Sequence, residues 1–573
     1  MEKETASMST PTTTSPSNLT PLSSAPTSRP ASPSPTPRRS KAATLALVAA
    51  LCLSVFLAAL DTVLITTALP TIAAQFHITD AGYAWIGSSY LLTNAASVPF
   101  WGKISDVWGR KPVLLIANGV FLVGSLVSAL ATGLAMLIAG RAVQGLGGGG
   151  IVILVNICIS DIFSIRDRGL YLGIVGAVWA IASSLGPVLG GAFTEKLSWR
   201  WCFWINLPAD GMAALVLLFF LDIHTPKVPL MAGLRSIDWL GAFTMAGATV
   251  MLLLGLQFGG VTYAWSSATV VCLLVFSALT FALFFAAQFK LSPSPIMPFS
   301  IFAHRSNLAA LAVCATDALV FNSVAYFLPL YFQSVLAASP LQSGTWMLAL
   351  AIPLSIFSAS AGWIMQKTGR YLELLRGGMA LMTLGLGLFI MLPPHLDWSR
   401  VIPFLVLVGI GFGPNFMAPL IALQTRLPPA DVALGTATFG FVRMLSGAVG
   451  VVLGQVVFQS QMERQFDRLR EAGIGESIVE ALARGGAIAE APARLTDVQD
   501  ELVRSVKTGS MAKMWILFTV VSGIGLLASF GISKVKLSSE HVEVKPGLGS
   551  SGVVSDTESE FREKEGVRRR EEV

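Results

Sequence analysis

Charged residues are scarce in this sequence. Only 13% of its 573 residues are Asp, Glu, Lys or Arg, and 53% are hydrophobic. Soluble domains carry about 25% charged residues, so this composition argues that most of the chain lies in lipid. The net charge of +6 is spread over loops and tails rather than gathered on one face, and it therefore predicts no nucleic-acid partner.

The sequence also lacks the motifs of enzymes, ATP-driven pumps and metal sites. No catalytic triad, Walker loop or zinc-ligand spacing is present, and no glycine run is followed by Lys-Ser or Lys-Thr. The five cysteines lie in or beside apolar runs and are interpreted as small buried hydrophobes. We therefore expect no enzymatic activity, no cofactor and no metal.

What the sequence does contain is a series of apolar runs, each long enough to cross a bilayer as a helix. We count fourteen, near residues 44–68, 83–101, 113–131, 135–158, 170–193, 201–221, 239–258, 268–289, 308–333, 345–366, 374–393, 401–424, 432–459 and 513–533. Lys and Arg gather in the loops on one side of this arrangement, which the positive-inside rule assigns to the cytoplasm together with both termini. The sequence thus predicts an all-α membrane protein.

Composition divides the chain into five parts. Residues 1–42, rich in Ser, Thr and Pro, are expected to be a disordered cytoplasmic tail. Residues 43–221 and 301–535 each hold six spans, and residues 222–300 link them through two extra spans. Residues 536–573 form a second cytoplasmic tail. An extracellular loop, residues 460–512, interrupts the second six-span part and is expected to fold as a small cap.

A short basic turn, Gly102–Pro112, joins the second and third spans. Its glycines let the backbone bend, and its aspartate is placed to pair with a cation or with a helix N-terminus. The motif residues are Gly102, Asp106, Gly109, Arg110 and Lys111. The spacing recurs at the end of the tenth span as Gly362, Gln366, Gly369 and Arg370, interpreted as a hinge. Such a repeat is typical of two transporter halves.

The turn resembles the G-x-L-x-D-x-x-G-R-K signature of the major facilitator superfamily, with Ile104 and Val107 replacing the usual Leu and Arg. Further motifs resemble its fourteen-span drug:proton antiporter branch. These are Leu60-Asp61 with Ala68-Leu69-Pro70, Leu137-x-x-x-Arg141-x-x-Gln144-Gly145, Gly186-Pro187-x-x-Gly190-Gly191 and Trp199-Arg200-Trp201. The Ser/Thr/Pro-rich tail, the long outer loop and Arg443 resemble fungal members in particular.

The resemblance implies the fold of that superfamily, with two six-helix bundles and two extra helices, fourteen transmembrane helices in all. It also implies a gating role for Gly186, Pro187, Gly190 and Gly191, which would seal the cavity against proton leak. Simple packing of small residues explains the same glycines equally well.

Two charges lie at similar depth in the first and fourth spans. Asp61 and Arg141 differ in depth by only about 5 Å at a rise of 1.5 Å per residue. Burial favours the protonated form of a carboxyl group, whereas a nearby guanidinium favours the ionised form. The two residues are therefore predicted to couple proton binding to transport, or else to form a structural ion pair.

A second group of polar residues lies in the later spans, among aromatic side chains. Asp317 and Arg443 are predicted to form another ion pair, unless Asp317 meets a cationic cargo. Ligand sites are mostly apolar with a few placed polar groups. The candidate lining of a substrate cavity is Asp317, Asn322, Tyr326, Asn415, Gln424 and Arg443.

These patterns together predict a proton-coupled efflux transporter for small apolar or amphipathic compounds, such as drugs, toxins or fungal secondary metabolites. Its partners would be a small-molecule substrate, protons and the lipid bilayer, and we expect a monomer in the plasma membrane. One alternative is a vacuolar transporter of basic amino acids, which would need acidic cavity residues. Another is a membrane sensor that transports nothing and signals through its tails.

Overall fold

The computed structural model describes residues 40–76, 80–223, 225–226, 228–260, 263–292, 295–475, 479 and 496–539. Leu45–Val573 forms one compact unit and Met1–Thr44 another. Nearly all of the two predicted tails lies outside the described residues. The unit that starts at Leu45 contains nearly all of the described residues.

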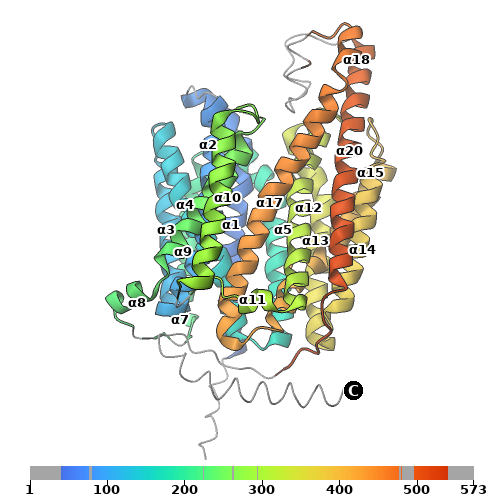
Figure 1. Ribbon diagram of the computed structural model, residues 1–573. Coiled ribbons are helices and arrows are strands. Elements are labelled where there is room, and N and C mark those ends of the chain that lie inside the picture. The colour runs from blue at the N-terminus through green and yellow to red at the C-terminus, as the bar shows by residue number, and fades with distance from the viewer. Residues whose placement is uncertain are drawn as a thin grey trace, which may run out of the picture. The chain divides into compact units, whose positions relative to one another are not determined.

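Long helices lying side by side build this unit (Figure 1), and the described residues contain no strand beyond one isolated bridge, Gly259–Tyr263. The helices are α1 (Lys41–Phe76), α2 (Asp80–Trp108), α3 (Arg110–Ala129), α4 (Leu134–Ile162), α5 (Ile165–Lys196), α6 (Trp201–Trp204), α7 (Asn206–Phe220), α8 (Leu230–Ser236), α9 (Trp239–Phe258), α10 (Ala268–Lys290), α11 (Ser300–Ala303), α12 (Arg305–Ser334), α13 (Pro340–Thr368), α14 (Leu372–Phe389), α15 (Trp398–Asn415), α16 (Ala418–Gln424), the 3-10 turn η1 (Pro429–Asp431), α17 (Val432–Glu463), α18 (Phe466–Glu471) and α20 (Asp497–Ser529).

All fourteen predicted spans fall on these helices. Among the described residues, 13 helical segments are long and apolar enough to cross a membrane. The predicted span that is missing from this set is α2. Its buried polar side chains Ser88, Ser89, Asn94 and Ser97 lower its hydropathy but face into the bundle, so α2 packs like its neighbours.

Three predicted boundaries differ from the structure. The link Gly102–Pro112 was expected to be a turn, but α2 continues to Trp108 and α3 begins at Arg110. The turn is Gly109 alone, whose φ of +90° favours glycine. The sixth span is broken between α6 and α7, and the twelfth is broken after Pro414, between α15 and α16.

Residues 460–475, 479 and 496–512 of the predicted cap are described, and long helices build much of this part. Helices α17 and α20 project beyond their neighbours, and α18 lies at their far end (Figure 1). The helix α20 starts at Asp497, well inside the predicted loop, with a capping box between Thr496 and Gln499. Met462 and Leu469 are fully buried there.

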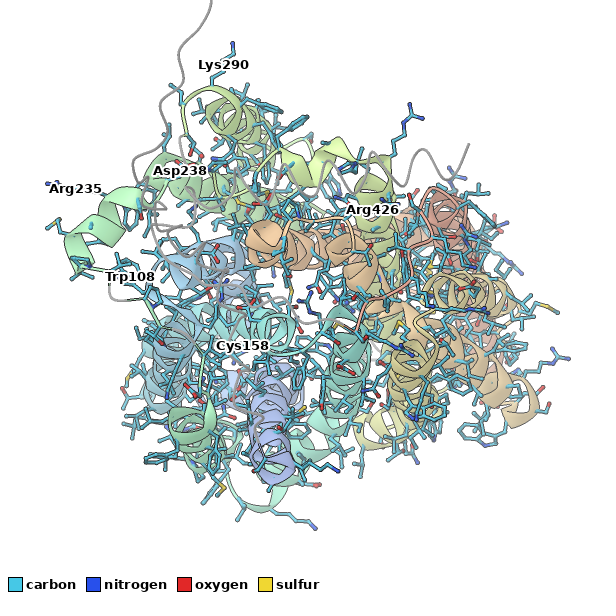
Figure 2. All side chains as sticks on the ribbon, turned by 90° about the horizontal axis from the view of Figure 1, so that it is seen from below. Trp108, Cys158, Arg235, Asp238, Lys290 and Arg426 are labelled. Carbon is cyan, nitrogen blue, oxygen red and sulfur yellow. The ribbon has the colours of Figure 1, made fainter. Side chains whose placement is uncertain are left out.

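We call the end of the bundle that holds Gly109 the basic end. Figure 2 shows it from below, with Trp108, Arg235, Asp238, Lys290 and Arg426 labelled. It is the end that the distribution of Lys and Arg predicts to be cytoplasmic.

Helices α1–α7 and α12–α20 form two bundles, and the extra helices α9 and α10 pack on each other, with α9 also packing against α2. The bundles meet mainly where α5 packs on α13 and where α2 packs on α17. A Cβ at Gly102 would lie 2.7 Å from the Ala437 Cβ, so this glycine gives α2 a close contact with α17 rather than a bend.

Candidate functional site

Asp61 and Arg141 form a buried ion pair between α1 and α4. Arg141 Nη1 donates to Asp61 Oδ2, and Nη2 donates to the Asp61 backbone carbonyl oxygen at 3.4 Å. Only 3% of Asp61 and 1% of Arg141 are exposed. The structure thus joins the two charges that the sequence places at similar depth.

Three buried polar side chains extend this pair to two further helices. Gln144 Oε1 accepts from Arg141 Nη1 at 2.8 Å, and Gln144 Nε2 donates to Ser125 Oγ at 2.9 Å. Asn206 Nδ2 lies 3.2 Å from both Asp61 Oδ1 and Ser125 Oγ. Since α1, α3, α4 and α7 all contribute to the network, a shift of one helix changes the hydrogen bonds of the ion pair.

Aromatic rings enclose the Arg141 guanidinium. Its Cζ lies 4.4 Å from the centroid of the Tyr90 ring, whose hydroxyl donates to the Ala58 carbonyl oxygen at 3.0 Å. Such a face-on contact attracts a cation. A Cβ at Gly145 would lie 2.2 Å from the Tyr90 carbonyl oxygen, so only glycine lets α4 approach α2 this closely.

This arrangement ties the charge of Asp61 to helix packing. An ionised Asp61 balances Arg141, whereas a protonated Asp61 leaves a buried cation without its counter-charge. Removing one partner from a buried ion pair costs about 3–5 kcal/mol. A proton on Asp61 therefore favours a different arrangement of α1 against α4, and the same pair, if never protonated, would simply hold the helices together.

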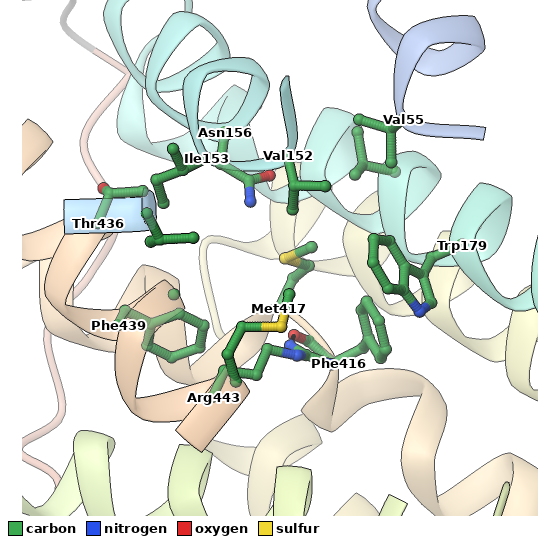
Figure 3. A pocket seen from close by; sticks show the side chains of 14 residues that line it. Val55, Val152, Ile153, Asn156, Trp179, Phe416, Met417, Thr436, Phe439 and Arg443 are labelled. Carbon is green, nitrogen blue, oxygen red and sulfur yellow. Dashed lines mark hydrogen bonds between the residues drawn. The ribbon is translucent and has the colours of Figure 1, made fainter. Parts of the chain in front are cut away.

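A small cavity lies between the two bundles (Figure 3). Its lining residues are Val55, Val98, Val152, Ile153, Asn156, Val175, Trp179, Phe416, Met417, Thr436, Phe439, Gly440, Arg443 and Met444. The space open to the centres of water molecules is about 50 Å³. It holds a few waters but no drug-sized compound, so the bundles would have to separate before cargo entered.

Arg443 is the charged residue of this lining. Its Cζ lies 3.7 Å from the centroid of the Phe416 ring, and Nη1 donates to the Phe416 carbonyl oxygen at 2.6 Å. Its Nη2 has no partner among the described residues. The predicted ion pair with Asp317 is not found among the described side chains within 4.0 Å, although Asp317 is buried and close enough for Arg443 to act on its charge.

The other candidate cavity residues lie outside this lining. Asn415 packs between α15 and α14, with Nδ2 donating to the Gly411 carbonyl oxygen, and Asn322 donates to the Ala318 carbonyl oxygen. Tyr326 is 52% exposed. Gln424 joins the bundles, because Arg168 Nη1 donates to its Oε1 at 3.2 Å while its Nε2 donates to Ser160 Oγ at 2.8 Å.

The motif at the basic end is a buried charge cluster. Arg110 donates to Asp106 Oδ1 at 2.5 Å and to Asp161 Oδ2 at 2.7 Å, which links α2, α3 and α4. Asp106 therefore pairs with a cation, which was one of its two predicted partners. Lys111 is half-buried in the first turn of α3.

The second copy of the motif contacts the first bundle. Gln366 Nε2 donates to Asp167 Oδ1 at 2.9 Å, and Arg166 Nε donates to the Gln366 carbonyl oxygen at 2.6 Å. A Cβ at Gly362 would lie 2.4 Å from the Gly169 carbonyl oxygen. Gly369 ends α13 in the left-handed conformation, and Arg370 follows it. This copy therefore lies where α5 and α13 must part if the basic end opens.

The glycines around Pro187 differ in how closely a neighbouring helix approaches them. A Cβ at Gly190 would lie 2.3 Å from the Leu64 carbonyl oxygen, and one at Gly186 would lie 3.0 Å from the Val63 Cβ. Nothing lies within 4 Å of a Cβ at Gly191. Gly186 and Gly190 therefore permit close packing of α5 on α1.

Sequence reasoning missed several parts of the site. The roles of Ser125 and Asn206 depend on how α3 and α7 pack, which no linear motif shows. Asn156 and Trp179, which face the cavity in Figure 3, carried a weak signal as polar or amphipathic residues within spans.

A family model described as Major Facilitator Superfamily matches residues 51–451. The chain belongs to this superfamily. It is therefore a multi-pass membrane transporter rather than an enzyme.

Fungal proteins of the superfamily are similar over most of their length. "Efflux pump dotC" of Dothistroma septosporum is 46% identical over 499 residues, covering 87% of this chain and 86% of that protein. "MFS-type transporter ppz2" of Metarhizium majus is 46% identical, covering 91% and 90%. "Efflux pump FUS6" of Gibberella fujikuroi is 35% identical, covering 78% and 81%.

Solved structures support the fold. The crystal structure of the human organic anion transporter MFSD10 (TETRAN) matches with a TM-score of 0.54 at 16% identity, covering 85% of this chain and 99% of that one. A bacterial homologue of the human lysosomal transporter Spinster, inward-facing and unoccupied, matches with a TM-score of 0.53 at 15% identity, covering 86% and 98%. At these identities the likeness concerns the fold alone.

Proposed function

We propose that this chain is a proton-coupled efflux transporter that exports small apolar or amphipathic compounds by alternating access. The observation that carries the proposal is the buried Asp61–Arg141 pair, shared among four helices. Its charge balance changes when a proton binds, and the helices around it can respond. The fungal relatives named as efflux pumps support the direction of transport.

In the proposed cycle the bundles alternate between opening to one side and to the other. Hydrogen bonds across the basic end, among them Gln366–Asp167 and Arg168–Gln424, hold that end closed in this structure. They must break before cargo enters from the basic end. A ligand or proton can drive this change only by binding one state more tightly than the other.

The cavity lining supports an apolar cargo. Its aromatic and aliphatic side chains suit a hydrophobic compound, and its one charged side chain is a cation, Arg443. A basic amino acid would meet repulsion there rather than a counter-charge. The efflux proposal therefore fits this lining better than the transport of basic amino acids.

We place the transporter in the plasma membrane with the basic end and both termini in the cytoplasm. The cations at that end support this orientation through the positive-inside rule. A vacuolar location remains the alternative. Imaging of the tagged chain would separate the two membranes.

The decisive experiment is transport by the purified chain in vesicles with an imposed pH gradient. Three fluorescent probes test how transport depends on the charge of the cargo. They are neutral N-phenylnaphthylamine, anionic fluorescein and cationic ethidium. We expect transport of at least the neutral probe by the wild type, driven by the gradient, and loss of this dependence in Asp61→Asn. Asp397→Asn is the matched control, because Asp397 is an exposed carboxylate at the start of α15. Gradient-driven transport by Asp61→Asn equal to the wild type would remove Asp61 from the mechanism.

A further inference from the structure

Asp210 is a further buried carboxyl group, outside both the Asp61–Arg141 pair and the cavity lining. It lies in α7, is 0% exposed, and neither carboxyl oxygen has a hydrogen-bond partner among the described residues. We propose that Asp210 is a second proton-binding residue of the transport cycle, placed on the basic-end side of Asp61. This inference rests on the proposed proton coupling and adds a site to it.

The position of Asp210 follows from two helices that run in opposite directions. Asn206, whose amide contacts Asp61, lies one turn before Asp210 in α7, which puts Asp210 about 6 Å further along the helix axis. In α1, Ser54 lies two turns before Asp61 on the same face, about 10 Å closer to the basic end. The Ser54 hydroxyl faces the Asp210 carboxyl without completing a hydrogen bond of normal geometry.

No basic side chain is placed to neutralise Asp210. Its own helix carries no other charged residue, and Cys202 is the titratable group of α6. In α3 the charged residues are Arg110 and Lys111, both in the first turn, more than about 15 Å from the level of Asp210. In α1 the titratable groups are Lys41, Cys52 and Asp61, and Asp61 is engaged with Arg141.

An isolated carboxylate in such surroundings is costly, and binding a proton removes that cost. In the proposed step one proton forms an O–H bond with a carboxylate oxygen of Asp210 and neutralises its charge. Its later release toward the basic end restores the carboxylate. No oxidant or co-reactant is needed, because only the proton moves.

Vibrational spectroscopy tests the proposal without any cargo. The purified chain in lipid is examined by infrared difference spectroscopy for the carbonyl stretch of protonated carboxylic acids. We expect a band that disappears in Asp210→Asn, persists in Asp61→Asn, and decreases when the pH is raised far enough to ionise the acid. A spectrum in which Asp210→Asn removes no carbonyl band, or in which the band removed never titrates in the wild type, would overturn the proposal.

Transport measurements separate a coupling role from a structural one. With the neutral probe, Asp210→Asn should lower the ratio of protons to cargo about twofold, because one of two proton sites is lost. Asp210→Glu, which keeps a titrating group, should restore the ratio. An unchanged ratio in a folded Asp210→Asn variant would contradict this inference alone, whereas a wild type indifferent to the pH gradient would contradict the proposed function.

Discussion

Arg110 makes two short charged contacts, to Asp106 and Asp161, and only 1% of its side chain is exposed. Replacing it with Ala leaves two carboxylates near each other without their cation. We expect Arg110→Ala to be destabilised by about 3–5 kcal/mol, as for other broken buried ion pairs. Thermal unfolding of the purified chain in detergent would measure the loss.

Lys111 is the matched control for that variant, since it is the neighbouring cation and makes no ion pair within 4.0 Å among the described residues. Lys111→Ala should change the unfolding temperature little. Equal destabilisation of the two variants would show that the net charge of the turn matters, and not the buried contacts of Arg110.

Arg443 offers a prediction about cargo charge. Its Nη2 has no partner among the described groups, so an acidic oxygen on a cargo molecule would find a donor there. A hydrogen bond to a charged group contributes about 1.5–3 kcal/mol. We expect Arg443→Gln to lower the transport of fluorescein about tenfold or more relative to N-phenylnaphthylamine. A parallel loss for both probes would assign Arg443 to the fold instead.

The sequence predicts the role of a single residue best where that type of residue is rare within a membrane span. Asp61 and Arg141 stand out because charges within spans are costly and rare, and their shared depth follows from the helical rise. Asn206 lies in the run that follows Trp199-Arg200-Trp201, but it and Ser125 carry no charge, so their residue types alone assign them no role. Their roles arise only when α7 and α3 pack beside α1.

Glycines set how closely one helix can approach the next. Gly190 and Gly191 are adjacent in α5, yet only Gly190 lies against the α1 backbone. We expect Gly190→Ala to push α5 from α1 and lower stability by about 1–3 kcal/mol. Gly191→Ala should be neutral, or stabilising by up to about 1 kcal/mol, since Ala favours helix more than Gly does.

Thermal unfolding and transport of both variants would check this pair. Similar unfolding temperatures for the two would mean that α1 and α5 can move apart at no cost. That result would remove the packing role of Gly190.

At the level of elements, the sequence predicts which segments are helices better than where they end. The fourteen predicted spans all fall on helices, and 13 helical segments of the described residues are long and apolar enough to cross a membrane. The predicted turn, Gly102–Pro112, is longer than the observed one, because the hydropathy falls at Gly102 whereas the helix continues to Trp108. Its polar last turns are stabilised by contacts that hydropathy does not report, namely Arg110 with Asp106 and Gly102 against α17.

The cavity forms only when the two bundles pack together, so it is a property of the whole molecule. Its lining comes from α1, α2, α4, α5, α17 and the α15–α16 junction, so residues such as Val55 and Met444 become neighbours only when the bundles meet. The repeated motif predicted two related halves, but it could not give the angle between them. That angle decides which aromatic residues face the cavity and which, like Tyr326, lie largely exposed.

A short segment after α20 crosses the junction of the bundles at the basic end. In this segment, Ser533–Ser538, the Ser533 carbonyl oxygen accepts from Tyr371 Oη at 2.8 Å, and Leu537 N donates to the Gly369 carbonyl oxygen at 3.3 Å. The Ser538 carbonyl oxygen accepts from Arg166 N, in α5 of the other bundle, at 3.2 Å. The segment therefore ties α5 and α13 together where they must separate.

Truncation tests whether this tie holds the basic end closed. A chain ending at Ile532 lacks the segment, whereas one ending at Ser539 keeps it and lacks only the tail beyond. Ser160 is fully buried beside Gln424 at the junction, so a cysteine at this position becomes accessible to a reagent when the basic end opens. The reporter variant is therefore Ser160→Cys, combined with Cys272→Ser to remove an exposed native cysteine. The Ile532 chain lacks the hydrogen bond from Arg166 N by which the segment reaches α5, which contributes about 1 kcal/mol to the closed state. We therefore expect maleimide to label the introduced cysteine about fivefold faster in the Ile532 chain than in the Ser539 chain. Equal labelling of the two would show that the bundles close the basic end without the segment.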